Sequence, residues 1–138
     1  MRAMTIAMCI GVLLSSTALL ARDGEKKLPF KLEHPGVVAL SEPSPGKWVY
    51  RSFPALMPLY INDRDPPGKS MCYKSCALAW PPLRADRNAE PVGDWTVIER
   101  EDGIRQWAYK GKPVYMRFHD DTANPTGDGV NGMRLLVP

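Results

Sequence analysis

The sequence predicts a mainly β fold: a small single domain of two pseudo-repeated β-hairpin units with one short Cys-containing helix. The main observation is a sequence pattern that occurs twice. Each copy begins with Trp, any residue, Tyr and a basic residue, and a turn follows. Each copy then continues with Pro, an aliphatic residue and Tyr, and Asp lies five positions after that Tyr. The two copies span residues 48–65 and 107–120. Such units rarely bury their apolar faces alone, so two copies predict one shared core.

The proline content gives a second indication of short strands and many loops. Fourteen of the 138 residues are proline. Each proline ends a helix or an inner strand and favours a turn. Long helices are therefore not expected.

Residues 1–21 have the pattern of a secretory signal peptide, in which Arg2 precedes an apolar stretch that runs to Ala21. Cleavage is expected after Ala21, with Ala18 as the alternative site. The stretch is only just long enough to span a bilayer. If it stayed uncleaved, it would be the only attachment to a membrane that we expect. We therefore expect a periplasmic or secreted protein.

The charge of the mature chain gives little indication of a partner. Once residues 1–21 are removed, 17 basic and 15 acidic residues remain, a net charge of +2. The basic residues are spread along the chain rather than clustered, which indicates that nucleic acid is not a partner. The partner stays unknown, and a periplasmic protein is one candidate.

The mature chain is expected to begin with an extended lead-in over residues 22–46, which is polar and rich in proline. Its apolar run at residues 37–40 predicts one edge strand. The duplicated β-repeat domain is then expected to occupy residues 47–138.

Two hairpins are predicted, one from each copy, and the second has a short turn built on Gly111. Their strands are expected at residues 47–52 with 57–62, and at residues 105–110 with 113–118.

Other elements are predicted outside the two hairpins. Ser70 is a candidate N-cap for a helix over residues 71–79, which Pro81 and Pro82 would end. The β-branched content of residues 95–99 predicts a strand that turns back at residues 101–103. A final strand is expected at residues 133–137.

The aromatic residues of each copy alternate along their strands, so those of one strand share a face. Packing in the core is the default for such residues in a small β domain, and a surface that stacks sugars or peptides is the alternative. The set comprises Trp48, Tyr50, Tyr60, Trp107, Tyr109 and Tyr115.

Four segments resemble a bacterial family of secreted or lipoprotein domains known as the secreted repeat of unknown function, which is marked by Tyr-x4-Asp repeats. They are residues 59–70, 72–83, 95–113 and 127–132. The repeat motif falls on Tyr60 with Asp65 and on Tyr115 with Asp120. The resemblance spans about residues 48–137 and implies no established reaction.

The chain departs from the family pattern at three points. Asn62 stands where an aromatic residue is common, and Arg134 stands where Trp is common. Both departures weaken an aromatic binding face. The lipid-attachment Cys of many members is missing, which favours a soluble periplasmic protein.

The mature chain retains Cys72 and Cys76, and an even number of cysteines outside the cytosol indicates a disulfide. As an alternative, the reduced pair could bind copper, because two thiolates with a third ligand suit Cu(I). The candidate third ligands are His119, Met71 and Met116. Thiol-disulfide exchange is a further alternative, although Cys-x3-Cys is not the usual oxidoreductase spacing.

The acidic residues could form carboxylate pairs for hydrolysis or oxygen ligands for calcium. Their positions at strand ends, before Pro/Gly loops, instead favour hydrogen bonds from nearby backbone N–H groups. They are Asp63, Asp65, Asp120, Asp121 and Asp128. No catalytic residue is predicted. The sequence indicates a non-enzymatic binding or structural module of unknown molecular function, with a copper-binding or thiol-redox accessory protein as the alternative.

Overall fold

The computed structural model describes residues 33–138, so the predicted signal peptide and the start of the lead-in lie outside the described residues. Between residues 33 and 138, no helix has the length and apolar character needed to cross a membrane.

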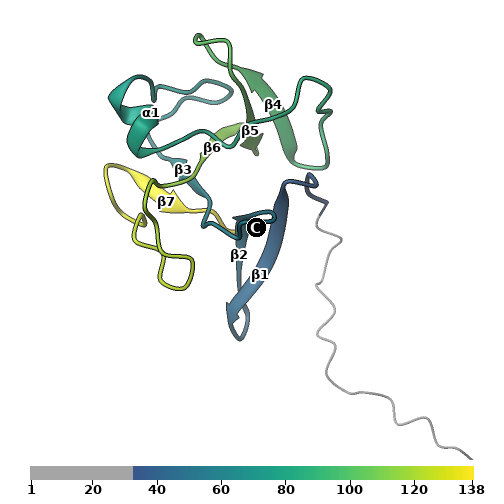
Figure 1. Ribbon diagram of the computed structural model, residues 1–138. Helices are drawn as coiled ribbons and strands as arrows, with labels where there is room; N and C mark the ends of the chain where they lie inside the picture. Colours follow the sequence, from purple (N-terminus) through teal and green to yellow (C-terminus); the bar gives the residue numbers. More distant parts are fainter. Residues whose placement is uncertain (1–32) are drawn as a thin grey trace, which may run out of the picture.

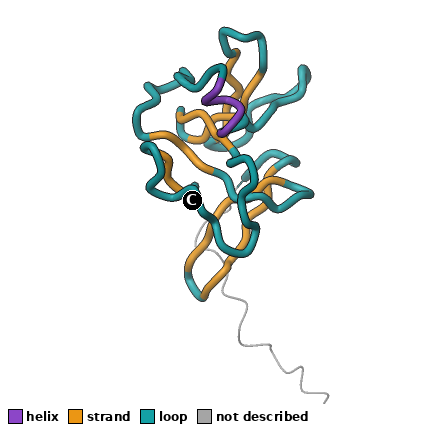
Figure 2. The backbone as a smooth tube through the Cα atoms, turned by 60° about the vertical axis from the view of Figure 1, so that its left-hand side comes forward, coloured by secondary structure: helices purple, strands orange, loops and turns teal. Residues whose placement is uncertain are grey.

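The described chain is mainly β with one short helix, which confirms the predicted fold class (Figure 1). A two-stranded sheet contains β1 and β2, and a five-stranded sheet has the order β4-β5-β6-β3-β7. Figure 2 shows the single helix among strands that are joined by extended loops. The elements are β1 (Val38–Ser44), β2 (Lys47–Ser52), β3 (Tyr60–Asn62), α1 (Ser75–Ala79), β4 (Trp95–Glu99), β5 (Arg105–Tyr109), β6 (Lys112–Tyr115) and β7 (Met133–Leu135).

The second predicted hairpin is present as β5 and β6, which pair through Tyr109 and Lys112. Lys110 and Gly111 connect the strands, and both have positive φ, at 48° and 79°. Two consecutive residues with a left-handed backbone conformation give a turn whose twist matches the right-handed twist of the flanking strands, which explains the tight turn.

The first predicted hairpin is only partly formed, and this corrects the expected pairing of residues 47–52 with 57–62. β2 pairs along its length with β1, and an isolated bridge between Arg51 and Pro58 is what remains of the expected ladder. Beyond Pro58 this ladder ends because Leu136 bonds to both segments: the Tyr50 N–H donates to the Leu136 carbonyl, and the Leu136 N–H donates to the Leu59 carbonyl. Strand β3 instead enters the five-stranded sheet.

The strand expected at residues 37–40 lies at β1 and is longer than predicted. Val38 is almost fully buried and belongs to the main hydrophobic core. The packed domain therefore includes part of the segment 22–46 that the sequence suggested was a lead-in.

The helix is shorter than predicted and begins at Ser75 rather than after Ser70. Lys74 precedes it with φ of 54° and provides no side-chain cap. Residues before Ser75 stay non-helical because other bonds hold Cys72: its N–H donates to Ser70 Oγ, and its carbonyl accepts from Arg100. The helix ends before Pro81, as predicted.

Strands β2 and β4 have the predicted bounds, whereas four strands are shorter than expected. Their predicted ranges were 57–62, 105–110, 113–118 and 133–137, against β3, β5, β6 and β7.

Two hydrophobic clusters form the interior. In the main core, the rings of Tyr50, Trp95 and Tyr109 lie 5.1–5.2 Å apart. The smaller core contains Tyr60, Cys72, Trp80, Tyr115 and Met133. Of the six aromatic residues of the repeats, only Trp48 is not buried, which supports the core interpretation over a stacking surface.

We predict that Gly127→Ala will destabilise the protein, because Gly127 lies directly against the smaller core. A Cβ atom there would lie 2.7 Å from the Tyr60 ring and 2.8 Å from Trp80. Overpacking of this kind costs about 1–3 kcal/mol of unfolding free energy.

Urea denaturation measures this effect, with Gly36→Ala as the control because a Cβ at Gly36 meets open space. The control should change the unfolding free energy by less than about 0.5 kcal/mol. Equal stability of the two variants would contradict the packing described here.

Candidate functional site

The two Tyr-x4-Asp motifs meet at the centre of the five-stranded sheet. Tyr60 on β3 lies directly opposite Tyr115 on β6 in the antiparallel register. Both side chains are fully buried. The two copies thus contribute their tyrosines to one interior, as the duplication predicts.

Each tyrosine donates its hydroxyl to the aspartate of the other copy. The Tyr60 hydroxyl lies 2.5 Å from Asp120 Oδ2, and the Tyr115 hydroxyl lies 2.5 Å from Asp65 Oδ2. The motif is therefore completed between the copies rather than within one copy. This exchange relates the two repeats by an approximate twofold axis.

The second carboxylate oxygen of each aspartate holds the loop that follows it. Asp65 Oδ1 accepts from the Met71 N–H, and Asp120 Oδ1 accepts from the Thr126 N–H, each at 2.9 Å. In both copies the donor is six residues after the aspartate. The expected bonding of these acids to backbone N–H groups is observed at both positions.

Burial and these hydrogen bonds also determine the protonation states of the two motif tyrosines and of Asp120. Burial raises the pKa of Tyr60 and of Tyr115, and the bond to the partner carboxylate raises each further. For Asp120, partial burial opposes ionisation, yet hydrogen bonds from Tyr60, Thr126 and Asp121 lower its pKa overall. The hydroxyls therefore remain donors and the Asp120 carboxylate an acceptor at neutral pH.

Arg100 extends the first motif into a buried network that the sequence analysis missed. Its side chain is fully buried and donates to Ser70 Oγ, to Gln106 Oε1 and to the Cys72 carbonyl. Ser70 Oγ in turn contacts the Tyr115 hydroxyl at 2.7 Å. An arginine directly after a strand carries no sequence signal that separates this role from a solvated one.

The Arg100 network also includes the turn after β4. Arg100 pairs with Asp102 at 3.0 Å and lowers the pKa of that carboxyl. The Arg100 guanidinium also lies 4.5 Å from the centre of the Tyr73 ring. The cysteine segment is thus fixed to the β4–β5 turn.

The cysteines form the predicted disulfide, with the sulfur atoms of Cys72 and Cys76 2.01 Å apart. Cys72 is buried in the smaller core, whereas Cys76 on α1 is half-buried.

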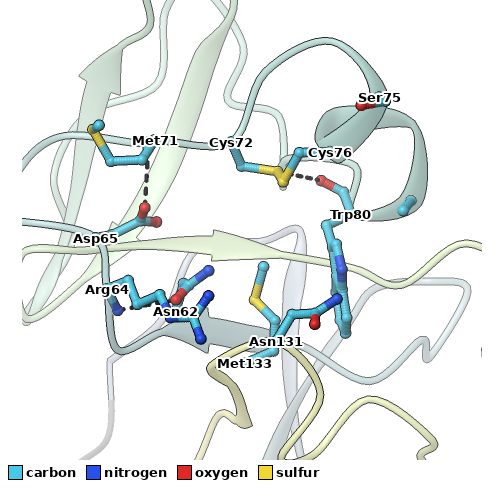
Figure 3. A pocket seen from close by; sticks show the side chains of 11 residues that line it. Asn62, Arg64, Asp65, Met71, Cys72, Ser75, Cys76, Trp80, Asn131 and Met133 are labelled. Atoms are coloured by element: carbon cyan, nitrogen blue, oxygen red, sulfur yellow. Dashed lines mark hydrogen bonds between the residues drawn. A yellow bond between two sulfur atoms is a disulfide. The ribbon is translucent and has the colours of Figure 1, made fainter.

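A cavity of about 410 Å³ lies beside this disulfide and is called the disulfide cavity below (Figure 3). It is bounded by α1, the end of β3 and the start of β7. Its apolar and sulfur-bearing lining consists of Met71, Cys72, Cys76, Ala79, Trp80 and Met133. Its polar lining consists of Asn62, Arg64, Asp65, Ser75 and Asn131.

The structure does not bring the alternative metal ligands together. Met71 lines the disulfide cavity with the two cysteines, but Met116 packs against the main core. His119 is exposed, with its ring 4.1 Å from that of Phe118. Residues 33–138 contain no cluster of three or more His, Cys, Asp or Glu side chains suited to a metal ion.

The remaining acids have structural partners of their own. Asp63, directly after β3, pairs with Arg134 of β7 at 2.6 Å. Asp121 accepts from the N–H groups of Ala123 and Asn124, and Asp128 accepts from that of Leu135. Asn62 lines the disulfide cavity.

Comparison with known proteins supports the family resemblance. Residues 96–137 match the family described as the secreted repeat of unknown function, a segment that contains the Tyr115 and Asp120 motif. The resemblance is thereby confirmed over this segment, and the family description indicates a secreted protein. No curated protein and no solved structure matches the chain.

We predict that a double-mutant cycle will show energetic coupling between Tyr60 and Asp120. Tyr60→Phe removes the donor and Asp120→Ala removes the acceptor of the same hydrogen bond, so their effects on the unfolding free energy should not add. The expected coupling is about 0.5–3 kcal/mol by urea denaturation.

The control cycle pairs Tyr60→Phe with Asp65→Ala, because these residues share no hydrogen bond in the described structure. Their coupling should be close to zero. A larger coupling within one copy than between copies would show that the exchange is wrong.

Proposed function

We propose that the protein is a periplasmic, non-enzymatic binding module. The exchanged Tyr-x4-Asp bonds supply its rigid frame, and the disulfide cavity receives the ligand. The observation that carries this proposal is that both motif carboxylates and both motif hydroxyls are occupied by structural hydrogen bonds.

The ionisable groups around the cavity favour binding over catalysis. General acid–base catalysis needs a group that can reach the substrate and exchange a proton near neutral pH. Arg64 and Asp65 are the ionisable residues of the lining, apart from the bonded cysteines. Arginine stays charged, and Asp65 is 2% exposed with both carboxylate oxygens already bonded.

The cavity has the size and composition of a binding site. Small-molecule sites usually have volumes of about 300–1,000 Å³ and combine an apolar surface with a few polar groups. Methionine side chains are flexible and polarizable, and they suit surfaces that adapt to a ligand. Met71 is 62% exposed, and its side chain has room to change conformation although Asp65 holds its backbone N–H.

A periplasmic location agrees with the disulfide. Such bonds persist in oxidising compartments and are rare in the cytosol. The family description supports export, and the absence of the family's lipid-attachment Cys favours the periplasm over membrane anchoring.

The test is a fragment screen followed by NMR on the exported, oxidised protein. Amide shifts should cluster on the cavity lining, and Ser75→Trp should abolish binding because it fills the cavity from α1. Leu78→Trp is the matched control, since Leu78 lies on the same helix, is 76% exposed and does not line the cavity. Shifts elsewhere alone, or none at all, would refute the proposal.

A copper-binding or thiol-redox role is a second candidate, and one observation favours it. Met71, Met133 and both cysteines line the same cavity, so reduction would expose two thiolates beside two thioethers. Soft sulfur ligands of this kind suit Cu(I). Met133 replaces His119 and Met116 as the third ligand in this version of the hypothesis.

Thiol titration and copper competition separate the two candidates. The binding module should show no free thiol when the isolated protein is unfolded. For the copper candidate, the reduced protein should hold one Cu(I) against a moderate chelator, and Met133→Leu should weaken it while Met116→Leu should not. Loss of copper to the chelator would eliminate this candidate.

A further inference from the structure

We infer that the disulfide cavity binds a carboxylate joined to a short apolar group, with Arg64 holding the carboxylate. This inference rests on the proposed function and names the ligand class of the same site. It depends on an arginine without a protein partner, on occupied acceptors and on an apolar interior.

Arg64 supplies a free positive charge at the rim of the cavity. Its guanidinium donates to no acceptor among the described residues, 33–138. Arg134 on the neighbouring β7 differs in this respect, because Asp63 neutralises it at 2.6 Å. The Arg64 guanidinium is therefore available to an anionic ligand.

The local backbone fixes where Arg64 lies. Its N–H donates to Asn62 Oδ1 at 2.9 Å, which joins the two residues in a tight turn. A Cβ at Gly132 would lie 3.3 Å from Arg64 Nε, so the side chain passes closely over this glycine. Figure 3 shows Arg64 and Asn62 side by side at one end of the cavity, with Trp80 and the disulfide at the other.

The polar groups that remain free at this end favour an anion. Asn62 accepts the Arg64 N–H with its Oδ1, so its Nδ2 is the amide atom that can donate to a ligand. Both oxygens of Asp65 are already occupied, by the Tyr115 hydroxyl and the Met71 N–H. A ligand at this rim thus meets donors from Arg64 and Asn62 and finds no free carboxylate.

The remaining lining residues determine which apolar group the ligand can carry. Met71, Met133, Trp80 and the disulfide offer sulfur and aromatic surface beyond the arginine. A planar guanidinium binds the two oxygens of a carboxylate in a bidentate manner. The cavity volume of about 410 Å³ limits the apolar group to a short chain or a single side chain.

This chemistry has two sources, a free small acid and the free carboxyl end of a peptide. Hexanoate represents the free acid, and N-acetyl-leucine represents the end of a peptide chain. Hexanol and N-acetyl-leucinamide are their uncharged counterparts. Binding is measured by NMR titration of the oxidised protein, with shifts followed at the cavity residues.

Each acid should bind at the cavity at least about tenfold more tightly than its uncharged counterpart, because hydrogen bonds to a charged group are the stronger ones. Arg64→Gln should weaken binding of the acids by a similar factor and leave the uncharged compounds unaffected. Arg134→Gln is the matched control and should leave all affinities unchanged.

The outcomes are distinct. Tighter binding of N-acetyl-leucine than of hexanoate identifies a peptide end, the reverse identifies a free acid, and either supports the inference. Three results would overturn the inference and leave the cavity as a binding site. They are equal binding of the acids and the uncharged compounds, no effect of Arg64→Gln, and binding of other fragments but not of the acids. Absence of any cavity ligand overturns the proposed function as well.

Discussion

The exchange of hydroxyl-to-carboxylate bonds between the two repeats is the constraint on which the rest of the structure depends. Tyr60 and Tyr115 are fully buried, and a buried hydroxyl without a partner costs about 1–3 kcal/mol. Each finds its acceptor only in the other copy, at Asp120 and Asp65. Each copy therefore relies on the other to satisfy the buried hydroxyl of its motif tyrosine.

The same bonds position the candidate site. Asp65 holds the N–H of Met71 with its second oxygen, and this sets the course of the chain into the cysteine segment. Arg100 then fixes that segment through the Cys72 carbonyl. The Trp80 ring returns against Tyr60, with ring centres 5.4 Å apart. The walls of the disulfide cavity are therefore set by the motif network.

Local signals predicted the elements that depend on local chemistry. Gly111 indicated the second hairpin turn, Pro81 indicated the end of the helix, and residues 95–99 indicated a strand. Choices between tertiary partners were not predictable in this way. β2 pairs with β1 and also bonds to Leu136, a residue far along the chain, and no local pattern indicates that choice. Ser70 resembles a helix cap although it belongs to a buried network. Spacing also cannot tell whether Tyr-x4-Asp closes within one copy or between two, or that Arg100 is buried.

The differences between the two copies explain why the cavity lies on one side of the approximate twofold axis. After the loop donor, Met71 or Thr126, the next residue is Cys72 in the first copy and Gly127 in the second. Gly127 donates to the Tyr60 hydroxyl at 3.2 Å and fits directly against that ring, which closes the second loop onto the core. Cys72 instead leads into the disulfide and α1, and the disulfide cavity is lined by this segment together with Asn62 of β3 and Met133 of β7. The frame requires two equivalent aspartates, but it does not require equivalent loops. The first loop carries Met71 and the disulfide, and among residues 33–138 the Arg64 guanidinium beside it has no partner for its charge.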